Sequence, residues 1–442
     1  MLRKVLHIAA LLLLLAGVSS CFKDSNFDFK SSGEGSGSYV VPSREPQSPD
    51  QRNVLLYVAG GFNSLAGYLS SDIADLEAGE LPGRSSPTEP VLLVLSRLPR
   101  DPADPDYSDP TAPVLFRLYA GADGAPVRDT LKVWSEDTPL SQAETMAEAF
   151  EQVTRAFPGN KYGMVFSSHA SGWLPPRYYE NPSAYEAAAK GPLALSRSAF
   201  QEYFPPIDRN AFPAVKSVGM DNGTVIREMD LDQFVAAIPF HLDYLLFDAC
   251  LMGCVEVAYE LRGVADIVGF SQTEVLADGF DYANLTKHLL TKTPNPVAVC
   301  QDYFNRYDAQ QGNLRSATIS VIDTREMDAL VDVCSMLFEK YRTEISQLPG
   351  YLVQGYFRFE RHYFYDLKDI LVKAGITPEE EALLQDALDK CLLYKAATPS
   401  FLSITIKNYS GLSMYLPSKG TSLLDKYYRE HIAWNRATGL VK

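Results

Sequence analysis

The sequence predicts an α/β fold, in which a mostly parallel sheet is flanked by helices and further helical and β elements follow at the C-terminal end. Short apolar runs typical of buried strands alternate with helical stretches over residues 54–322. Such alternation favours parallel strands with both sheet faces covered. The 442 residues are 46% hydrophobic and 21% charged, which provides enough apolar side chains for a sizeable core.

The first 50 residues are expected to lie outside the folded domain. Arg3 and Lys4 precede an apolar run over residues 5–15, which is too short to span a bilayer and predicts a signal peptide over residues 1–20. Small residues before Cys21 resemble the bacterial lipobox, which implies that Cys21 is lipidated and becomes the new N-terminus. The alternative is an ordinary cleaved signal with an incidental cysteine. Residues 21–50, rich in Gly, Ser and Pro, predict a flexible tether.

A lipidated Cys21 implies a bacterial cell-envelope protein, anchored by its acyl chains in the outer membrane or at the cell surface. The formal net charge of −15 argues against a nucleic-acid partner, because phosphates would be repelled. This charge favours cationic ligands, although it also serves solubility alone. The other five cysteines are an odd number without a C-x-x-C pair, so we expect a free thiol and no metal site.

The folded domain is expected to cover residues 51–442. Residues 175–229 have weak periodicity and predict an irregular insertion. Residues 340–400 predict mainly helix. The strands are expected at residues 54–59, 91–95, 114–119, 162–167, 244–247, 267–270 and 317–322, with a helix over 140–157 and a closing β pair formed by 401–406 and 412–416.

Two predicted strands end next to side chains that can carry chemistry. His169 follows the strand over 162–167, and Cys250 follows the strand over 244–247. Ligands of open α/β sheets bind at the carboxyl ends of strands, and a histidine beside a cysteine can activate its thiol. Each residue alone is more often structural, as an inert core thiol or a packed histidine, so the pair matters only if the fold brings the two strand ends together.

The residues around this pair resemble the signature segments of the clostripain family of cysteine peptidases. The resemblance covers about residues 52 to 417, and its most specific part is the segment around Cys250. The matching segments are Ser168-His169-Ala170-Ser171-Gly172-Trp173, Phe247-Asp248-Ala249-Cys250-Leu251-Met252-Gly253, Ser271-Gln272-Thr273-Glu274, Asp278-Gly279-Phe280-Asp281-Tyr282 and Ser410-Gly411-Leu412-Ser413-Met414-Tyr415-Leu416-Pro417.

The resemblance implies a caspase-like fold, shared with gingipains and legumain, and cleavage of proteins or peptides after Arg or Lys. It implies His169 as the general acid and base and Cys250 as the nucleophile of a thioester mechanism. Asp248 and Asp278 match positions that bind the basic side chain, since paired carboxylates hold a guanidinium strongly. The alternatives are a cap on a helix beginning near residue 251 for Asp248, and a turn residue for Asp278.

One position departs from the family pattern. Many members have Gly directly after the histidine, where its N–H helps to bind the oxyanion, and here that residue is Ala170. Alanine keeps the N–H, so Ala170 and Cys250 are expected to supply the oxyanion hole. Trp173 is expected to wall the site, with ordinary packing as its alternative. Some family members need calcium, but no loop here has EF-hand spacing, so no cofactor is assigned and calcium stays open.

Family members are often cut by themselves between the His and Cys segments. Basic residues that could serve as such sites are Lys190, Arg197, Arg209, Lys216 and Arg227. Two other functions stay open. The Ala170 departure is compatible with an inactive caspase-like surface lipoprotein that binds peptides or a partner, and the same pair of residues could serve an amidase or transpeptidase.

Overall fold

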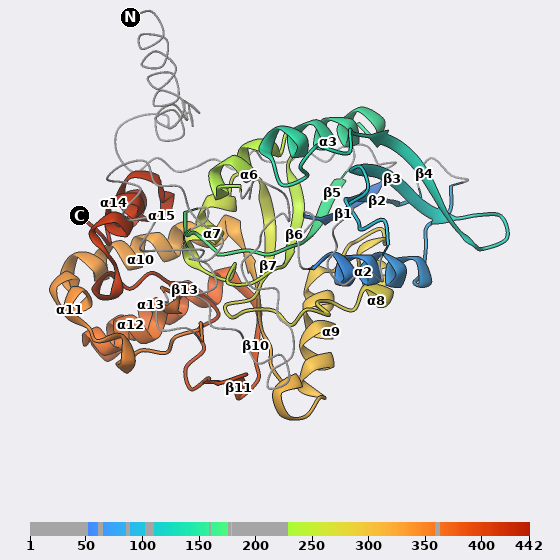
Figure 1. Cartoon of the computed structure of the whole chain (residues 1–442). Coiled ribbons are helices and arrows are strands. Elements are labelled where there is room, and N and C mark those ends of the chain that lie inside the picture. The colour runs from blue at the N-terminus through green and yellow to red at the C-terminus, as the bar shows by residue number, and fades with distance from the viewer. Residues whose placement is uncertain are drawn as a thin grey trace, which may run out of the picture. The chain divides into compact units, whose positions relative to one another are not determined.

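A nine-stranded sheet runs through the part of the chain that the computed structural model describes, which is residues 52–60, 65–84, 89–101, 110–158, 161–175, 178, 229–358 and 363–442 (Figure 1). All of these residues belong to one compact unit, Ser43–Lys442. In spatial order the strands are β10 (Leu392–Ala397), β8 (Thr318–Asp323), β7 (Ala265–Phe270), β6 (Leu242–Asp248), β5 (Lys161–Ser167), β1 (Asn53–Ala59), β2 (Val91–Ser96), β3 (Val114–Ala120) and β4 (Pro126–Val133).

The centre of the sheet is parallel and its edges are antiparallel. Strands β2, β1, β5, β6 and β7 pair in parallel, while β3 and β4 on one side and β8 and β10 on the other pair antiparallel. Every residue of β1 and β2 is buried, as expected for strands covered on both faces. The chain proceeds outward from β1 to β4 and then returns to place β5 on the other side of β1. This reversal makes the β1/β5 boundary a switch point, beside which ligands of such sheets bind.

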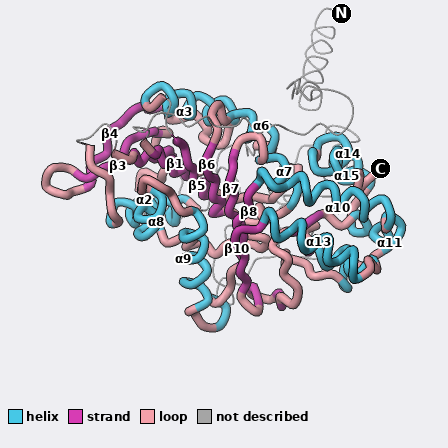
Figure 2. Tube along the Cα trace, turned by 180° about the vertical axis from the view of Figure 1, so that it is seen from behind, coloured by secondary structure: helices cyan, strands magenta, loops and turns pink. Residues whose placement is uncertain are grey.

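Helices cover both faces of this sheet, as the two opposite views show (Figures 1 and 2). Helices α2 (Ala66–Ala78), α8 (Tyr282–Leu289) and α9 (Pro296–Asp308) lie together on one face, and α3 (Ala143–Ala156), α6 (Leu231–Ala237) and α7 (Val255–Leu261) lie on the other. The C-terminal part adds α10 (Met327–Lys340), α11 (Arg342–Gln347), α12 (Leu367–Ala374), α13 (Pro378–Cys391), α14 (Ser422–His431) and α15 (Ala433–Thr438), with 3₁₀ turns at Gly312–Leu314, Thr324–Glu326, Gly350–Leu352 and Pro417–Lys419.

The expected closing β pair is wrong. The strands β11 (Ser400–Phe401) and β12 (Ile404–Thr405) pair with each other, because the chain turns back between them at Leu402, whose φ is +49°. Strand β13 (Ser413–Met414) pairs instead with β9 (Tyr365–Asp366). The region 340–400 contains the expected helices α12 and α13 but ends in β10, which joins the main sheet.

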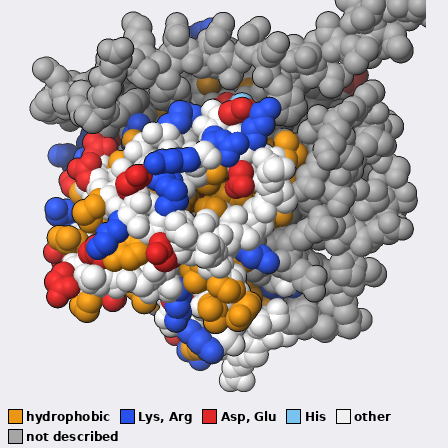
Figure 3. Space-filling view, turned by 90° about the vertical axis from the view of Figure 1, so that its left-hand side faces the viewer, with side chains coloured by type: hydrophobic (Ala, Val, Ile, Leu, Met, Phe, Trp, Pro, Cys, Tyr) orange, Lys and Arg blue, Asp and Glu red, His pale blue; other side chains and the backbone are white. Residues whose placement is uncertain are grey.

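The surface that carries α11 and α14 has mixed charge. Figure 3 shows Lys and Arg side chains beside Asp and Glu on this face, with hydrophobic side chains scattered among them. The net charge of −15 therefore does not appear as a uniform acidic field on that side of the molecule. None of the described helices combines the length and the apolar character that a membrane span requires.

The C-terminal segment is fastened to the loop that follows β6. The Ser413 N–H donates to the Gly253 carbonyl at 2.9 Å. The buried carboxyl group of Glu256, in α7, accepts from the Tyr415 N–H at 2.8 Å and the Tyr428 hydroxyl at 2.7 Å. Burial raises the pKa of Glu256 to about 7. Glu256 therefore links α7, which follows Cys250 in the chain, to the C-terminal residues Tyr415 and Tyr428.

We predict that the native chain loses stability between about pH 4.5 and 7 as Glu256 ionises, and that Glu256→Gln removes this loss. A carboxyl whose pKa rises from 4.5 unfolded to about 7 folded contributes stability that is fully present below pH 4.5 and is lost as the pH rises to about 7. The stability of the Gln variant relative to the native chain should therefore increase by about 3 kcal/mol across that interval. Urea unfolding at several pH values measures it.

The control is Glu344→Gln, which removes a carboxylate from an exposed position of α11. It tests whether the loss of any carboxylate changes the dependence of the unfolding free energy on pH. A Glu256→Gln profile parallel to the native one would show that this carboxyl is not the cause.

Candidate active site

The pairing of β5 with β6 brings the predicted His and Cys segments together. The two strands are parallel, and Ser167 lies opposite Asp248. His169 and Cys250 each follow two residues beyond that pair, so both leave the sheet at the same edge and at the same distance along their strands. The Ser168 N–H donates to the Asp248 carbonyl at 3.4 Å, which extends the contact by one residue.

The end of β1 joins the same edge. The Gly60 N–H donates to the Ser167 carbonyl at 2.8 Å, and the Ser168 hydroxyl donates to the Gly60 carbonyl at 2.9 Å. The candidate site therefore lies next to the β1/β5 switch point, where the fold favours ligand binding.

The loop after β5, residues 168–175 (the His loop), touches the loop after β6, residues 249–254 (the Cys250 loop), at a glycine. Gly172 has φ +62°, and a Cβ placed on it would come within 2.7 Å of the Leu251 carbonyl oxygen and 2.6 Å of a Phe364 ring carbon. Leu251, directly after Cys250, has φ +63°, which is rare for a residue with a branched side chain. Strained backbone of this kind concentrates at functional sites, where the surrounding structure enforces it.

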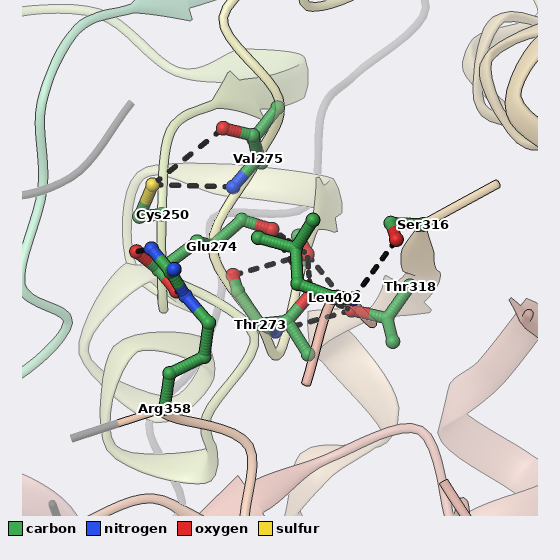
Figure 4. A network of polar contacts seen from close by, with 9 residues as sticks. Cys250, Thr273, Glu274, Val275, Ser316, Thr318, Arg358 and Leu402 are labelled. Atoms are coloured by element: carbon green, nitrogen blue, oxygen red, sulfur yellow. Dashed lines mark hydrogen bonds and ion pairs between the residues drawn. The ribbon is translucent and has the colours of Figure 1, made fainter. Parts of the chain in front are cut away.

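The Cys250 side chain is fully buried in this structure. Its sulfur accepts a hydrogen bond from the Val275 N–H at 3.1 Å and lies 4.0 Å from the Val275 carbonyl oxygen (Figure 4). The adjacent backbone is tied to the same segment, because the Leu251 N–H donates to the Thr273 carbonyl at 2.9 Å and the Gly253 N–H to the Ser271 carbonyl at 2.7 Å.

The predicted segment Ser271–Glu274 is thus the support of the cysteine loop. Its own side chains are anchored on β8, since the Ser271 and Thr273 hydroxyls lie 2.8 and 2.9 Å from the Thr318 hydroxyl. Glu274 is completely buried and forms an ion pair with Arg358 at 2.6 Å. Figure 4 shows Arg358 and Glu274 in the same network as Cys250 and Val275.

Asp248 ends β6 in a buried polar cluster. Its carboxylate accepts from the Tyr282 hydroxyl at 2.6 Å and the Ser167 hydroxyl at 3.2 Å. A second buried acid, Asp72 of α2, accepts from the Tyr57 hydroxyl at 3.1 Å and lies 3.5 Å from the Ser167 hydroxyl. The capping alternative for Asp248 is wrong, because α7 begins only at Val255 and its N-cap residue is Cys254.

Asp278 is exposed and lies in the turn that the Gly279 N–H closes on the Leu276 carbonyl at 2.9 Å. Gly279 has φ +56°, and a Cβ on it would come within 2.1 Å of the Asp248 carboxylate. The turn therefore brings Asp278 to the neighbourhood of Asp248, with one carboxylate at the surface and the other in the interior.

Trp173 lies in the core, with 1% of its surface exposed. Its ring contacts the rings of Phe364, Tyr415 and Tyr428. Through Tyr415 and Tyr428, Trp173 packs the segment that follows His169 against the C-terminal part of the chain. Ala170, like His169, is half-buried.

Several predictions fall outside the described residues. These are the signal peptide, Cys21 and the tether, and the cut sites Lys190, Arg197, Arg209, Lys216 and Arg227. Within the described part of the chain, no group of three or more His, Cys, Asp or Glu side chains could hold a metal ion. Arg358, Val275 and Asp72 have no place in the sequence prediction, because none of them belongs to a matching segment.

A mostly parallel α/β sheet with a histidine and a cysteine beyond adjacent strand ends is the arrangement expected of a cysteine peptidase. The profile described as the clostripain family matches residues 207–436, just over half of the chain, and the chain belongs to this family of cysteine peptidases.

Known proteins agree with this assignment. Clostripain from Hathewaya histolytica is 23% identical over an alignment of 262 residues, which covers 55% of this chain and 43% of that protein, so the chain spans less than half of that relative's length. The crystal structure of an inactive zymogen C11 protease from Parabacteroides distasonis is 26% identical, with a TM-score of 0.67 and coverage of 88% of this chain and 97% of that one.

A secreted C11 cysteine protease from Bacteroides thetaiotaomicron, in complex with an irreversible peptide inhibitor, is 22% identical, has a TM-score of 0.66 and covers 88% of this chain and 99% of its own. At that identity the similarity shows a shared fold. The expected α/β architecture, a mostly parallel sheet flanked by helices, is therefore confirmed.

We predict that Gly172→Ala destabilises the chain by about 2 kcal/mol more than Gly439→Ala does. The two glycines have nearly equal φ angles, +62° and +64°, but no atom lies within 4 Å of a Cβ on Gly439. Both variants carry the cost of a left-handed alanine, and only Gly172→Ala also pushes against the Leu251 carbonyl. Equal unfolding free energies would show that the two loops are not in contact.

Proposed function

We propose that this chain is a cysteine endopeptidase that cleaves after Arg or Lys, with His169 and Cys250 as its catalytic pair. The observation that carries the proposal is the parallel register of Ser167 with Asp248, which gives His169 and Cys250 matching positions at one sheet edge. Membership of the clostripain family supports the same reaction.

In this reaction the Cys250 thiolate attacks the peptide carbonyl carbon and forms a C–S bond. The Ala170 and Cys250 N–H groups stabilise the oxyanion. The His169 imidazolium gives its proton to the leaving amine as the C–N bond breaks. Water, deprotonated by His169, then attacks the thioester and releases the acid product and the thiol.

The buried sulfur adds a condition to this proposal. A peptide carbonyl cannot reach Cys250 while its side chain has no exposed surface. The described arrangement is therefore proposed to be a closed precursor, which opens after the chain is cut between the His and Cys segments. The similar Parabacteroides distasonis protein was itself solved as an inactive zymogen.

We predict that Cys250→Ala and His169→Ala each lower the turnover of fluorogenic Arg or Lys peptides by at least about 10³-fold, because each removes a reacting group. Peptides with Asp or Asn at the cleaved position measure the background. Mass spectrometry should find a cut within residues 175–229 in the active native preparation and an intact Cys250→Ala chain.

Cys254→Ser is the matched control, because Cys254 is a buried thiol at the N-cap of α7, where serine is favoured. It should retain activity. Full turnover by Cys250→Ala would refute the proposed nucleophile, and an uncut chain that cleaves substrate would refute the precursor.

The preference for Arg and Lys is proposed to depend on Asp248 and Asp278. We predict that Asp248→Asn lowers kcat/KM for an Arg substrate by about a hundredfold, since it removes a buried charge that would pair with the guanidinium. Asp278→Asn should have a smaller effect, about tenfold, because water screens its exposed carboxylate.

Asp123→Asn removes the same charge at an exposed turn between β3 and β4 and serves as the control. Asp278→Asn leaves the core untouched, so the test stands even if Asp248→Asn folds poorly. Unchanged kcat/KM in both variants would refute the assigned pocket.

Full burial of Cys250 also favours a second candidate, a catalytically inactive surface protein that binds a peptide or a partner. A chloromethylketone with a basic side chain separates the two. Covalent labelling of Cys250, before or after trypsin treatment, supports the peptidase, and no labelling under either condition supports the binding protein.

A further inference from the structure

A buried ion pair lies directly behind the candidate nucleophile. Arg358 grips Glu274 with two hydrogen bonds, from Nε to Oε2 at 2.6 Å and from Nη2 to Oε1 at 2.9 Å. The side chain of Glu274 is fully buried and that of Arg358 is 8% exposed. Burial of two charges costs desolvation energy that their attraction often only balances, so stability alone is a weak reason for this pair.

One member of this pair, Glu274, is the neighbour in sequence of the residue whose N–H donates to Cys250. Glu274 immediately precedes Val275, whose N–H donates to the Cys250 sulfur at 3.1 Å. The pKa of Arg358 is lowered by burial, but the hydrogen bonds and charge of Glu274 and the charge of Cys250 raise it overall. An ionised Cys250 sulfur would therefore attract the guanidinium.

The other side of this segment is held independently. The Thr273 N–H donates to the Thr318 hydroxyl at 3.1 Å, which fixes the segment to β8. At Glu274 the backbone turns from these β8 contacts to Cys250, and Arg358 holds the Glu274 carboxylate. The ion pair therefore holds the residue directly before the Val275 N–H, whose backbone carbonyl also accepts from the Thr273 hydroxyl at 2.9 Å.

We propose that Arg358 and Glu274 are positioning residues that clamp the Val275 N–H onto the Cys250 sulfur and thereby hold the sulfur as a thiolate. A hydrogen-bond donor and a nearby cation both favour the thiolate over the thiol. The inference rests on the proposed function, because it takes Cys250 as the nucleophile. Its test reads the charge of the sulfur and not peptide turnover, so the two proposals can fail separately.

The experiment follows the ultraviolet absorbance of the thiolate between about pH 5 and 9, around the ordinary titration of cysteine. Subtraction of the same titration of Cys250→Ser isolates Cys250. Absorbance does not require a reagent to enter the site, so the buried sulfur can be measured in the full chain as it is.

Two variants test the clamp. Arg358→Lys keeps the charge but loses the two-pronged grip. Arg358→Met combined with Glu274→Gln removes both charges, which avoids an unpaired buried acid and preserves the fold better than either single loss. We expect both variants to raise the midpoint of the Cys250 titration, the double variant by about one pH unit or more.

The matched control is Arg325→Lys. Arg325 also holds a carboxylate, that of Asp323, with two hydrogen bonds, of 2.8 and 2.5 Å, but it lies at the end of β8 and is half exposed. It should leave the midpoint unchanged. Near-ultraviolet circular dichroism shows that each variant is folded.

The outcomes separate clearly. A raised midpoint in both variants supports the clamp. A raised midpoint in the double variant alone would mean that charge acts without the two-pronged grip, and this would overturn the proposal. Unchanged midpoints, or no Cys250 thiolate in the native chain over this pH range, would overturn it as well.

Discussion

The parallel pairing of β5 with β6 is the constraint on which the site depends. In a parallel pair, residues at equal offsets beyond the last hydrogen-bonded partners leave the sheet in the same direction. The register of Ser167 with Asp248 therefore sets the relation between His169 and Cys250. A slip of one residue would turn every side chain of the strand to the opposite face and separate the two loops.

The Cys250 loop is held from several sides at once. The 271–275 segment binds its backbone and sulfur, the His loop approaches it at Gly172, and the C-terminal segment binds the Gly253 carbonyl. These contacts hold the loop in place, and the Cys250 thiol has no exposed surface.

Much of the sheet followed from local patterns. Within β1, β2, β5 and β6, residues 54–59, 91–95, 162–166 and 244–247 form runs without a charged side chain, as is typical of strands covered on both faces. The edge strands β4 and β10 alternate exposed and less exposed residues and contain several charged side chains, so their sequences carry a weaker signal. The partners of β11 and β13 were missed because strands of two residues hold no information about distant pairing.

By itself, the sequence determined the α/β class, the positions of His169 and Cys250 beyond two strand ends and the family, because buried strands and short motifs are local and continuous in the chain. The tertiary structure alone decided that the two strands are neighbours in register, that Asp248 lies in a cluster with Asp72, and that Arg358 reaches Glu274 behind Cys250. Arg358 lies 84 residues from its partner, and contacts across such separations arise only when the chain folds.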